Sequence, residues 1–111
     1  MEILTQKAGG ATVMTLTGRL DAVTAPQYEK NVRVLIEGDD CHFVADFTGL
    51  EYISSAGLRG LLVTAKLLSA KGKQVRFANV TGAIKEVFEV SGFDSIFQID
   101  ESVDAALNAL A

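Results

Sequence analysis

The feature that most constrains the fold is a short apolar run, H-F-V-A-D-F, at residues 42–47. Apolar residues at nearly every position, rather than at every second one, are typical of a strand that is covered on both faces. The residues before this run follow a helical period instead, with Tyr28, Val32, Leu35 and Ile36 on one face. A second helical pattern follows the run. We therefore predict a central strand in an α/β sheet.

Strands and helices alternate along the chain. Strands are predicted over residues 3–7, 12–17, 42–47, 75–78 and 96–99, and helices start after Thr24, near Ser55, after Thr81 and after Ser102. The order β-β-α-β-α-β-α-β-α predicts right-handed crossovers and a mostly parallel sheet of about five strands. The turn Ala8-Gly9-Gly10 joins the first two strands as an antiparallel hairpin, so the sheet is expected to be mixed.

The composition fits one domain, residues 1–111, and disfavours several functions. Of the 111 residues 49% are hydrophobic, which is enough to form a core that needs no disulfide bonds or metal ions to hold it together. The net charge of -4 opposes binding to nucleic acid, and no apolar stretch approaches the ~20 residues that span a bilayer. Cys41 and the only histidine, His42, supply too few ligands for a usual zinc site, and no cofactor is expected. A single cysteine without an export signal favours the cytoplasm.

The functional signal lies in the stretch D-F-T-G-L-E-Y-I-S-S-A-G-L-R-G-L, residues 46–61. The strand is expected to end at Phe47, and a short loop then leads to Ser54 and Ser55 at the start of a helix. Loops after the carboxyl ends of strands form the usual functional edge of such a sheet. The unpaired N–H groups of a helix start also favour an anion. Phosphate would be tolerated there.

Two glycines in the same helix have two interpretations. Gly57 and Gly60 cost roughly 1 kcal/mol each relative to alanine, and they would leave the first turns bare for close approach by another surface. Alternatively, the glycines allow tight packing and a serine caps the helix, which the pattern alone favours. We expect Ser55 to be the cap and Ser54 to lie outside the helix start.

Two separated motifs resemble the signature of the STAS family, specifically the bacterial anti-sigma factor antagonists. In that family a strand ending in D-[LF]-[ST] leads through a hydrophobic loop to a D-S-[SA]-G-L helix start. The matching residues are Asp46-Phe47-Thr48, Tyr52-Ile53 and Ser54-Ser55-Ala56-Gly57-Leu58, and Gly18-Arg19-Leu20-Asp21 matches the earlier G-x-[LI]-[DN] element. The length and element order are also similar to those of the family.

The resemblance implies a binding module and not an enzyme. Such antagonists bind a serine kinase that doubles as an anti-sigma factor, and thereby release the sigma factor. The kinase then phosphorylates the central serine of the motif, which ends the complex, and a metal-dependent serine phosphatase restores it. By position the acceptor is Ser55, with Ser54 as the less favoured alternative. The acid common before the acceptor is replaced by Ser54, which removes one recognition charge.

The expected partner-binding surface surrounds this serine. It comprises Asp21, Asp46, Ser54, Ala56, Gly57, Arg59 and Gly60. Structural alternatives are a turn acid for Asp21, a strand-end acid for Asp46 and a solvated helix residue for Arg59. A hydrolase is disfavoured because S-S-A-G-L is not a G-x-S-x-G elbow. The alternative function within the family is a subunit of a lipid or anion transporter, or of a stress-signalling assembly.

Overall fold

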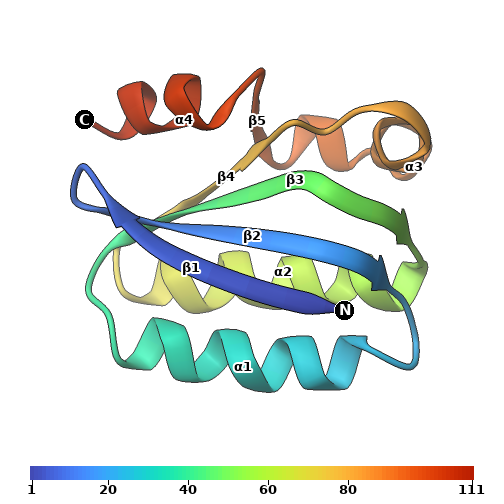
Figure 1. Ribbon diagram of the computed structural model, residues 1–111, viewed down its shortest axis with the longest axis horizontal. Helices are drawn as coiled ribbons and strands as arrows, with labels where there is room; N and C mark the ends of the chain where they lie inside the picture. Colours follow the sequence, from blue (N-terminus) through green and yellow to red (C-terminus); the bar gives the residue numbers. More distant parts are fainter.

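The computed structural model describes all 111 residues and forms a five-stranded sheet with helices on both sides (Figure 1). The helices α1 and α2 lie side by side under one face, α4 lies over the other, and α3 lies near the end of β3. The elements are β1 Glu2–Ala8, β2 Ala11–Leu20, α1 Ala25–Glu37, β3 His42–Ile53, α2 Ser55–Ala70, β4 Val75–Ala78, α3 Gly82–Ser91, the 3-10 turn η1 Phe93–Ser95, β5 Gln98–Asp100 and α4 Val103–Leu110. No helix combines the length and the apolar character that crossing a membrane requires.

The predicted mixed α/β architecture is confirmed. The strand order is β1-β2-β3-β4-β5, with β1 antiparallel to β2 and all other neighbours parallel. Gly9 and Gly10 form the turn of the hairpin, which closes on the pair Ala8 and Ala11. Both glycines have positive φ, +57° and +81°, as a two-residue turn between twisted strands requires.

The strand β3 is central and covered on both faces, as its apolar run predicts. Phe43 and Phe47 face a core shared with α1, α2 and α3, whereas Val44 faces a smaller cluster with Ala78 of β4 and Ala106 of α4. All five side chains are at least 98% buried. This double layer fixes β3 and therefore the position of the helix that follows it.

Two strands run further than expected. We predicted that β2 ends at Thr17 and β3 at Phe47, but they continue to Leu20 and Ile53. The loop expected after Phe47 is absent, because residues 48–53 keep pairing with the end of β2 across two register shifts. Each shift adds an unpaired residue to β3 and breaks the alternating pattern on which sequence reasoning depends.

The last strand also starts later than expected. It begins at Gln98 and not at Ile96, because the chain first makes the 3-10 turn Phe93–Ser95. The amide of Phe97 donates to the carbonyl of Phe93 at 2.9 Å, and its ring enters the core, where its centroid lies 4.7 Å from that of Phe77. The boundaries predicted for β4 and for the four helix starts agree with the structure.

Candidate functional site

The start of α2 is held at the carboxyl ends of β2 and β3. Leu20 and Ile53, the last residues of the two strands, pair with each other. The carbonyl of Leu20 also accepts a hydrogen bond from the amide of Ser54 at 3.0 Å. The structure therefore places both serines at the edge of the sheet where loops usually carry function.

The two serines have different environments. Ser54 is the N-cap residue, with extended backbone, and its Oγ accepts a hydrogen bond from the amide of Gly57 at 3.3 Å. Ser55 is the first residue of the helix and is exposed, and its hydroxyl makes no hydrogen bond within the chain. The expectation that Ser55 caps the helix and Ser54 lies outside it is wrong. Capping by Ser54 leaves the hydroxyl of Ser55 free.

The expectation of a bare helix surface at the two glycines is also wrong, because both are buried. A Cβ at Gly57 would lie 2.5 Å from the carbonyl oxygen of Leu20 and 2.8 Å from Cγ1 of Ile53. A Cβ at Gly60 would lie 3.1 Å from Cδ2 of the buried Tyr28 in α1. The two glycines let α2 pack closely against the ends of the strands and against α1. They therefore set the position of the helix start that carries Ser55.

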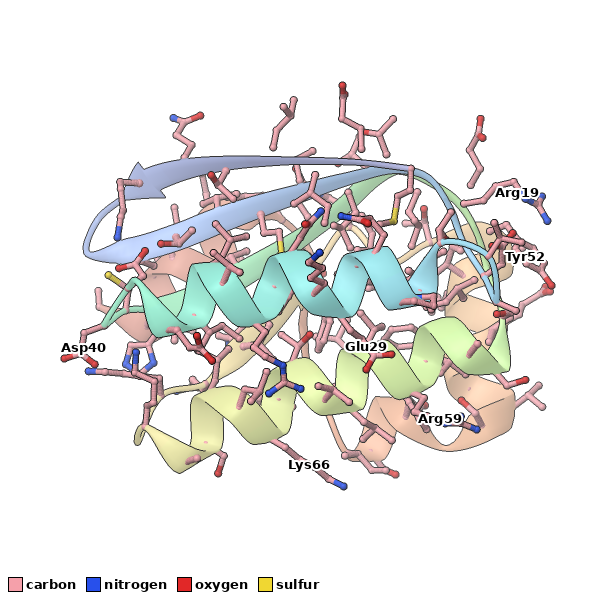
Figure 2. All side chains as sticks on the ribbon, turned by 90° about the horizontal axis from the view of Figure 1, so that it is seen from below. Arg19, Glu29, Asp40, Tyr52, Arg59 and Lys66 are labelled. Atoms are coloured by element: carbon pink, nitrogen blue, oxygen red, sulfur yellow. The ribbon has the colours of Figure 1, made fainter.

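The remaining predicted residues of α2 differ in exposure. Ala56 is half-buried and packs against the main core. Arg59 is exposed and extends from α2 one turn beyond Ser55 (Figure 2). Of the predicted α2 surface, Ser55 and Arg59 are therefore the residues most open to a partner.

Asp46 is occupied by contacts within the chain. Its Oδ1 accepts hydrogen bonds from the amide and hydroxyl of Thr48, at 3.0 and 2.7 Å, and from Nδ2 of Asn79 at 2.9 Å. Burial alone would raise the pKa of Asp46, but the bonds from Asn79 and Thr48 outweigh it and lower the pKa. Asn79 has φ +60°, a left-handed conformation that asparagine tolerates. Asp46 thus ties β3 to the loop before α3. These contacts support a structural role, but within the strand and not at its end, because β3 continues to Ile53.

Asp21 organises the turn between β2 and α1. Its Oδ1 accepts from the amides of Val23 and Thr24, at 3.0 and 3.2 Å, and its Oδ2 lies 3.4 Å from Nε of Arg19. The hydrogen bond from the Thr24 amide is the main reason that the pKa of Asp21 is lowered. Thr24 is the N-cap position of α1, but its own side chain makes no capping bond. The structure supports the turn-acid alternative for Asp21.

A cation–π pair beside these residues was missed as a site feature. Arg19 and Tyr52 are opposite each other in the parallel register of β2 and β3, and the guanidinium carbon lies 4.2 Å from the ring centroid (Figure 2). Tyr52 is 41% exposed. Both residues fall within the two motifs, and their juxtaposition would have been predictable only with the strands extended to Leu20 and Ile53.

A groove beside Ser55 is the second feature that the sequence did not reveal. It has a volume of about 500 Å³ and separates the start of α2 from α3. Its lining consists of Ser55, Leu58, Ala83, Glu86, Val87, Val90 and Ser91. Val90 is 90% exposed, although it belongs to a helix whose other large apolar residues are covered. The one sequence signal for this groove is Val90, an apolar residue that lies off the helical face of Ile84 and Phe88.

The only histidine lies far from Ser55 along the sheet. His42 begins β3, whereas Ser55 follows the end of that strand, and Nδ1 of His42 accepts from the amide of Gln74 at 3.0 Å. No group of three or more His, Cys, Asp or Glu side chains is arranged to hold a metal ion. The arrangement around Ser55 presents a free hydroxyl and an apolar groove, without an adjacent imidazole base.

The amino-acid sequence is similar to those of known proteins. Residues 2–106 match the family model of the STAS domain. BtrV of Bordetella bronchiseptica, which is named as an anti-sigma factor antagonist, is 34% identical over 109 residues, covering 98% of this chain and 94% of BtrV.

Solved structures share the fold. An anti-sigma factor antagonist from Mycobacterium paratuberculosis has a TM-score of 0.87 at 24% identity, with 98% of this chain and 92% of that chain covered. The anti-sigma factor antagonist SpoIIAA matches with a TM-score of 0.72 in its unphosphorylated form, and Bacillus SpoIIAA in the phosphorylated form matches with a TM-score of 0.73. These matches are 16% and 19% identical and cover 97% and 99% of this chain, and 96% and 100% of SpoIIAA.

Proposed function

Because the chain belongs to the STAS domain family, we propose that it acts as an anti-sigma factor antagonist that is switched by phosphorylation of Ser55. Residues 1–111 act as one domain in the cytoplasm. The unphosphorylated protein binds an anti-sigma factor serine kinase, phosphorylation releases it, and a metal-dependent serine phosphatase reverses the change. The observation that carries this proposal is the free, exposed hydroxyl of Ser55 on the rim of the groove between α2 and α3.

The geometry favours Ser55 over Ser54 as the acceptor. A kinase must reach the hydroxyl oxygen, and Ser55 offers one that is exposed and makes no hydrogen bond within the chain. The hydroxyl of Ser54 is half-buried and caps the helix through the amide of Gly57. Phosphorylation of Ser54 would have to break this cap, at a cost of about 1 kcal/mol.

The proposed switch depends on a phosphate at Ser55 that the start of α2 can stabilise but that a partner covering the groove cannot accommodate. A phosphate adds about -1.5 to -2 charges at pH 7, and the N-terminus of α2 stabilises such a charge. The fold should therefore persist. A partner that covers the groove would have to strip water from the phosphate without supplying a counter-charge of its own, which is costly. Binding is lost although the antagonist stays folded.

The protein is a binding module in this proposal, and the apolar groove is its docking pocket. Leu58, Val87 and Val90 offer an apolar lining to a partner side chain, and Ser55 lies beside them. Arg19 and Tyr52 extend the same edge of the sheet. The partner therefore meets a mostly apolar surface that includes one acid, Glu86, and that can acquire a further negative charge at Ser55.

The test uses the histidine-kinase-like serine kinases of the host genome, purified and screened for binding. The kinase that binds is incubated with the antagonist and ATP, and the modified residue is mapped by fragmentation in wild type, Ser55→Ala and Ser54→Ala. We expect phosphate on Ser55, full modification of Ser54→Ala and at least tenfold weaker binding by the phosphorylated protein. Modification confined to Ser54, or equal affinity of both forms, would reject the proposal. Capture of a transporter ATPase instead would support the transporter alternative.

A further inference from the structure

The charges of the chain are strongly segregated. Residues 52–85 contain no Asp or Glu, although the chain has fourteen acids. The same segment holds six of the ten basic residues, namely Arg59, Lys66, Lys71, Lys73, Arg76 and Lys85. The remainder of the chain is therefore strongly acidic, and the segment around α2 is basic.

Two of these cations already have partners within the chain. Arg76 pairs with Asp100 of β5 through Nε, at 2.7 Å. Nζ of Lys71 donates to the carbonyls of Ile36 and Asp39, at 2.6 and 2.7 Å, and so ties the end of α2 to the end of α1. These two side chains stabilise the fold and are not available to a partner.

Arg59 and Lys66 are free. Both are exposed on α2, and no acidic group lies within ion-pair distance of either. A separation of seven residues is almost two helical turns, so they project from the same side of α2. Figure 2 shows both on the side of α2 that faces away from α1, whereas Glu29 of α1 is directed toward the gap between the two helices. We call Arg59 and Lys66 the basic ridge.

The basic ridge is continuous with the phosphoacceptor. Ser55 and Arg59 are one turn apart, and Leu62 and Val63, which are half-buried, lie between Arg59 and Lys66. One face of α2 thus carries a free hydroxyl, a cation, an apolar strip and a second cation in that order. A partner that covers Ser55 and continues along α2 would meet both cations.

We propose that the basic ridge binds an acidic surface of the anti-sigma factor kinase and steers the encounter so that Ser55 is presented to it. This inference rests on the proposed function. A local positive surface on an acidic protein creates a directional field, which raises the association rate with a complementary partner and orients it. The partner surface is predicted to be rich in Asp and Glu.

The same ridge also links docking to release. Residues four apart on a helix are neighbours, so a phosphate on Ser55 lies within reach of Arg59. Phosphorylation would give Arg59 a partner within its own chain and withdraw it from the kinase. The charge that attracts the kinase before the reaction is thereby neutralised after it.

The experiment measures association rates with the kinase that binds the wild-type antagonist, by stopped flow from low to high salt. The double variant Arg59→Glu/Lys66→Glu is compared with Lys30→Glu/Arg33→Glu, which makes the same charge change on exposed residues of α1. We expect at least tenfold slower association and a weaker salt dependence for the α2 variant, and less than a threefold change for the α1 variant. Arg59→Gln/Lys66→Gln should fall between wild type and the α2 reversal.

The outcomes separate this inference from the proposed function. Wild-type rates for both α2 variants, with circular dichroism showing them folded, would overturn the ridge while leaving the antagonist function in place. Equal slowing by the α1 and α2 reversals would also overturn it, because net charge alone would explain the rates. Absence of binding by the wild-type protein to every kinase would overturn both.

Discussion

Two adjacent serines at the start of α2 differ because only one of them lies inside the helix. Ser54→Ala removes the hydroxyl that accepts from the amide of Gly57, so it should lower the free energy of unfolding by ~0.5–2 kcal/mol. Ser55→Ala removes an exposed hydroxyl that makes no hydrogen bond, so the free energy of unfolding should change by less than ~0.5 kcal/mol. Urea denaturation of the two variants measures the difference, and a larger loss for Ser55→Ala would contradict the assignment of the cap.

The two buried glycines of α2 should differ in how much a methyl group costs. In Gly57→Ala the new Cβ meets the carbonyl oxygen of Leu20 at 2.5 Å, and this backbone atom is fixed in the sheet, so we expect a loss of ~1–3 kcal/mol. In Gly60→Ala the Cβ meets the ring of Tyr28 at 3.1 Å, and a gain in helix propensity of up to ~1 kcal/mol partly offsets the strain. In denaturant melts, Gly57→Ala should have a lower free energy of unfolding than Gly60→Ala. Equal stability of Gly57→Ala and wild type would show that the close approach is relaxed.

The sequence indicates the serine pair and the glycines but not their orientation. Either hydroxyl can cap a helix, and the choice is decided by the hydrogen bond from the amide of Ser54 to Leu20, a residue 34 positions away. Similarly, a glycine that faces solvent and one that faces a backbone carbonyl are indistinguishable in the sequence. Contacts between distant segments settle both questions.

At the scale of elements, Asp46 connects the irregular part of β3 to the loop before α3, and its pKa gives a pH test. Because the pKa of Asp46 is lowered in the folded state, its carboxylate stabilises the protein above the unfolded pKa of about 3.9. That contribution is lost as the pH falls through the folded pKa. Asp46→Asn should therefore be less stable than wild type at pH 7, and the difference should shrink below about pH 4.

The control for this experiment is Asp94→Asn, at an exposed carboxylate in η1 without a hydrogen-bond partner. The free energy of unfolding of Asp94→Asn should differ little from that of wild type across the measured range. The free energy of unfolding, measured for both variants between pH 3 and pH 7, supplies the comparison. A stability difference for Asp46→Asn that is independent of pH would show that the charge of Asp46 does not contribute.

The groove between α2 and α3 is tested by its most exposed apolar side chain. Val90→Asp places a charge on the groove, so it should weaken kinase binding at least tenfold, while the free energy of unfolding changes little because Val90 is 90% exposed. Val34→Asp makes the same change on α1, where Val34 is 65% exposed, and should bind normally. Titration with the kinase distinguishes the two variants. Normal binding by Val90→Asp would exclude the groove from the interface.

The elements of the fold were predictable to different degrees. The apolar run of β3 and the helical periods around it identify the α/β order, since each pattern is local. The ends of β2 and β3 were not predictable, because the bulges that extend β3 to Ile53 interrupt the alternation of apolar and polar residues. The Arg19–Tyr52 pair depends on that extension and was missed for the same reason.

For the whole molecule, we expect the proposed release from the kinase to occur without a change of fold. The capping bond of Ser54, the bond from its amide to Leu20 and the packing of Gly57 do not involve the hydroxyl of Ser55. They should therefore remain when Ser55 is modified. A phosphate on Ser55 would gain ~0.3–1 kcal/mol from the dipole of α2, and Arg59 one helical turn away would be within its reach. The phosphorylated protein should therefore unfold at the same denaturant concentration as the unmodified one, or at a higher concentration, while the proposed function expects it not to bind the kinase.

Amide NMR spectra of the two forms test this expectation residue by residue. Chemical-shift changes should be confined to the start of α2, the facing residues of α3 and the neighbouring ends of β2 and β3. Residues of β5 and α4 serve as the internal control, because α4 packs on the opposite face of the sheet through Ala106. Shifts spread through α4, or a lower unfolding midpoint for the phosphoprotein, would mean that the phosphate acts through the core. Confined shifts with lost binding would locate the switch at the surface that carries Ser55.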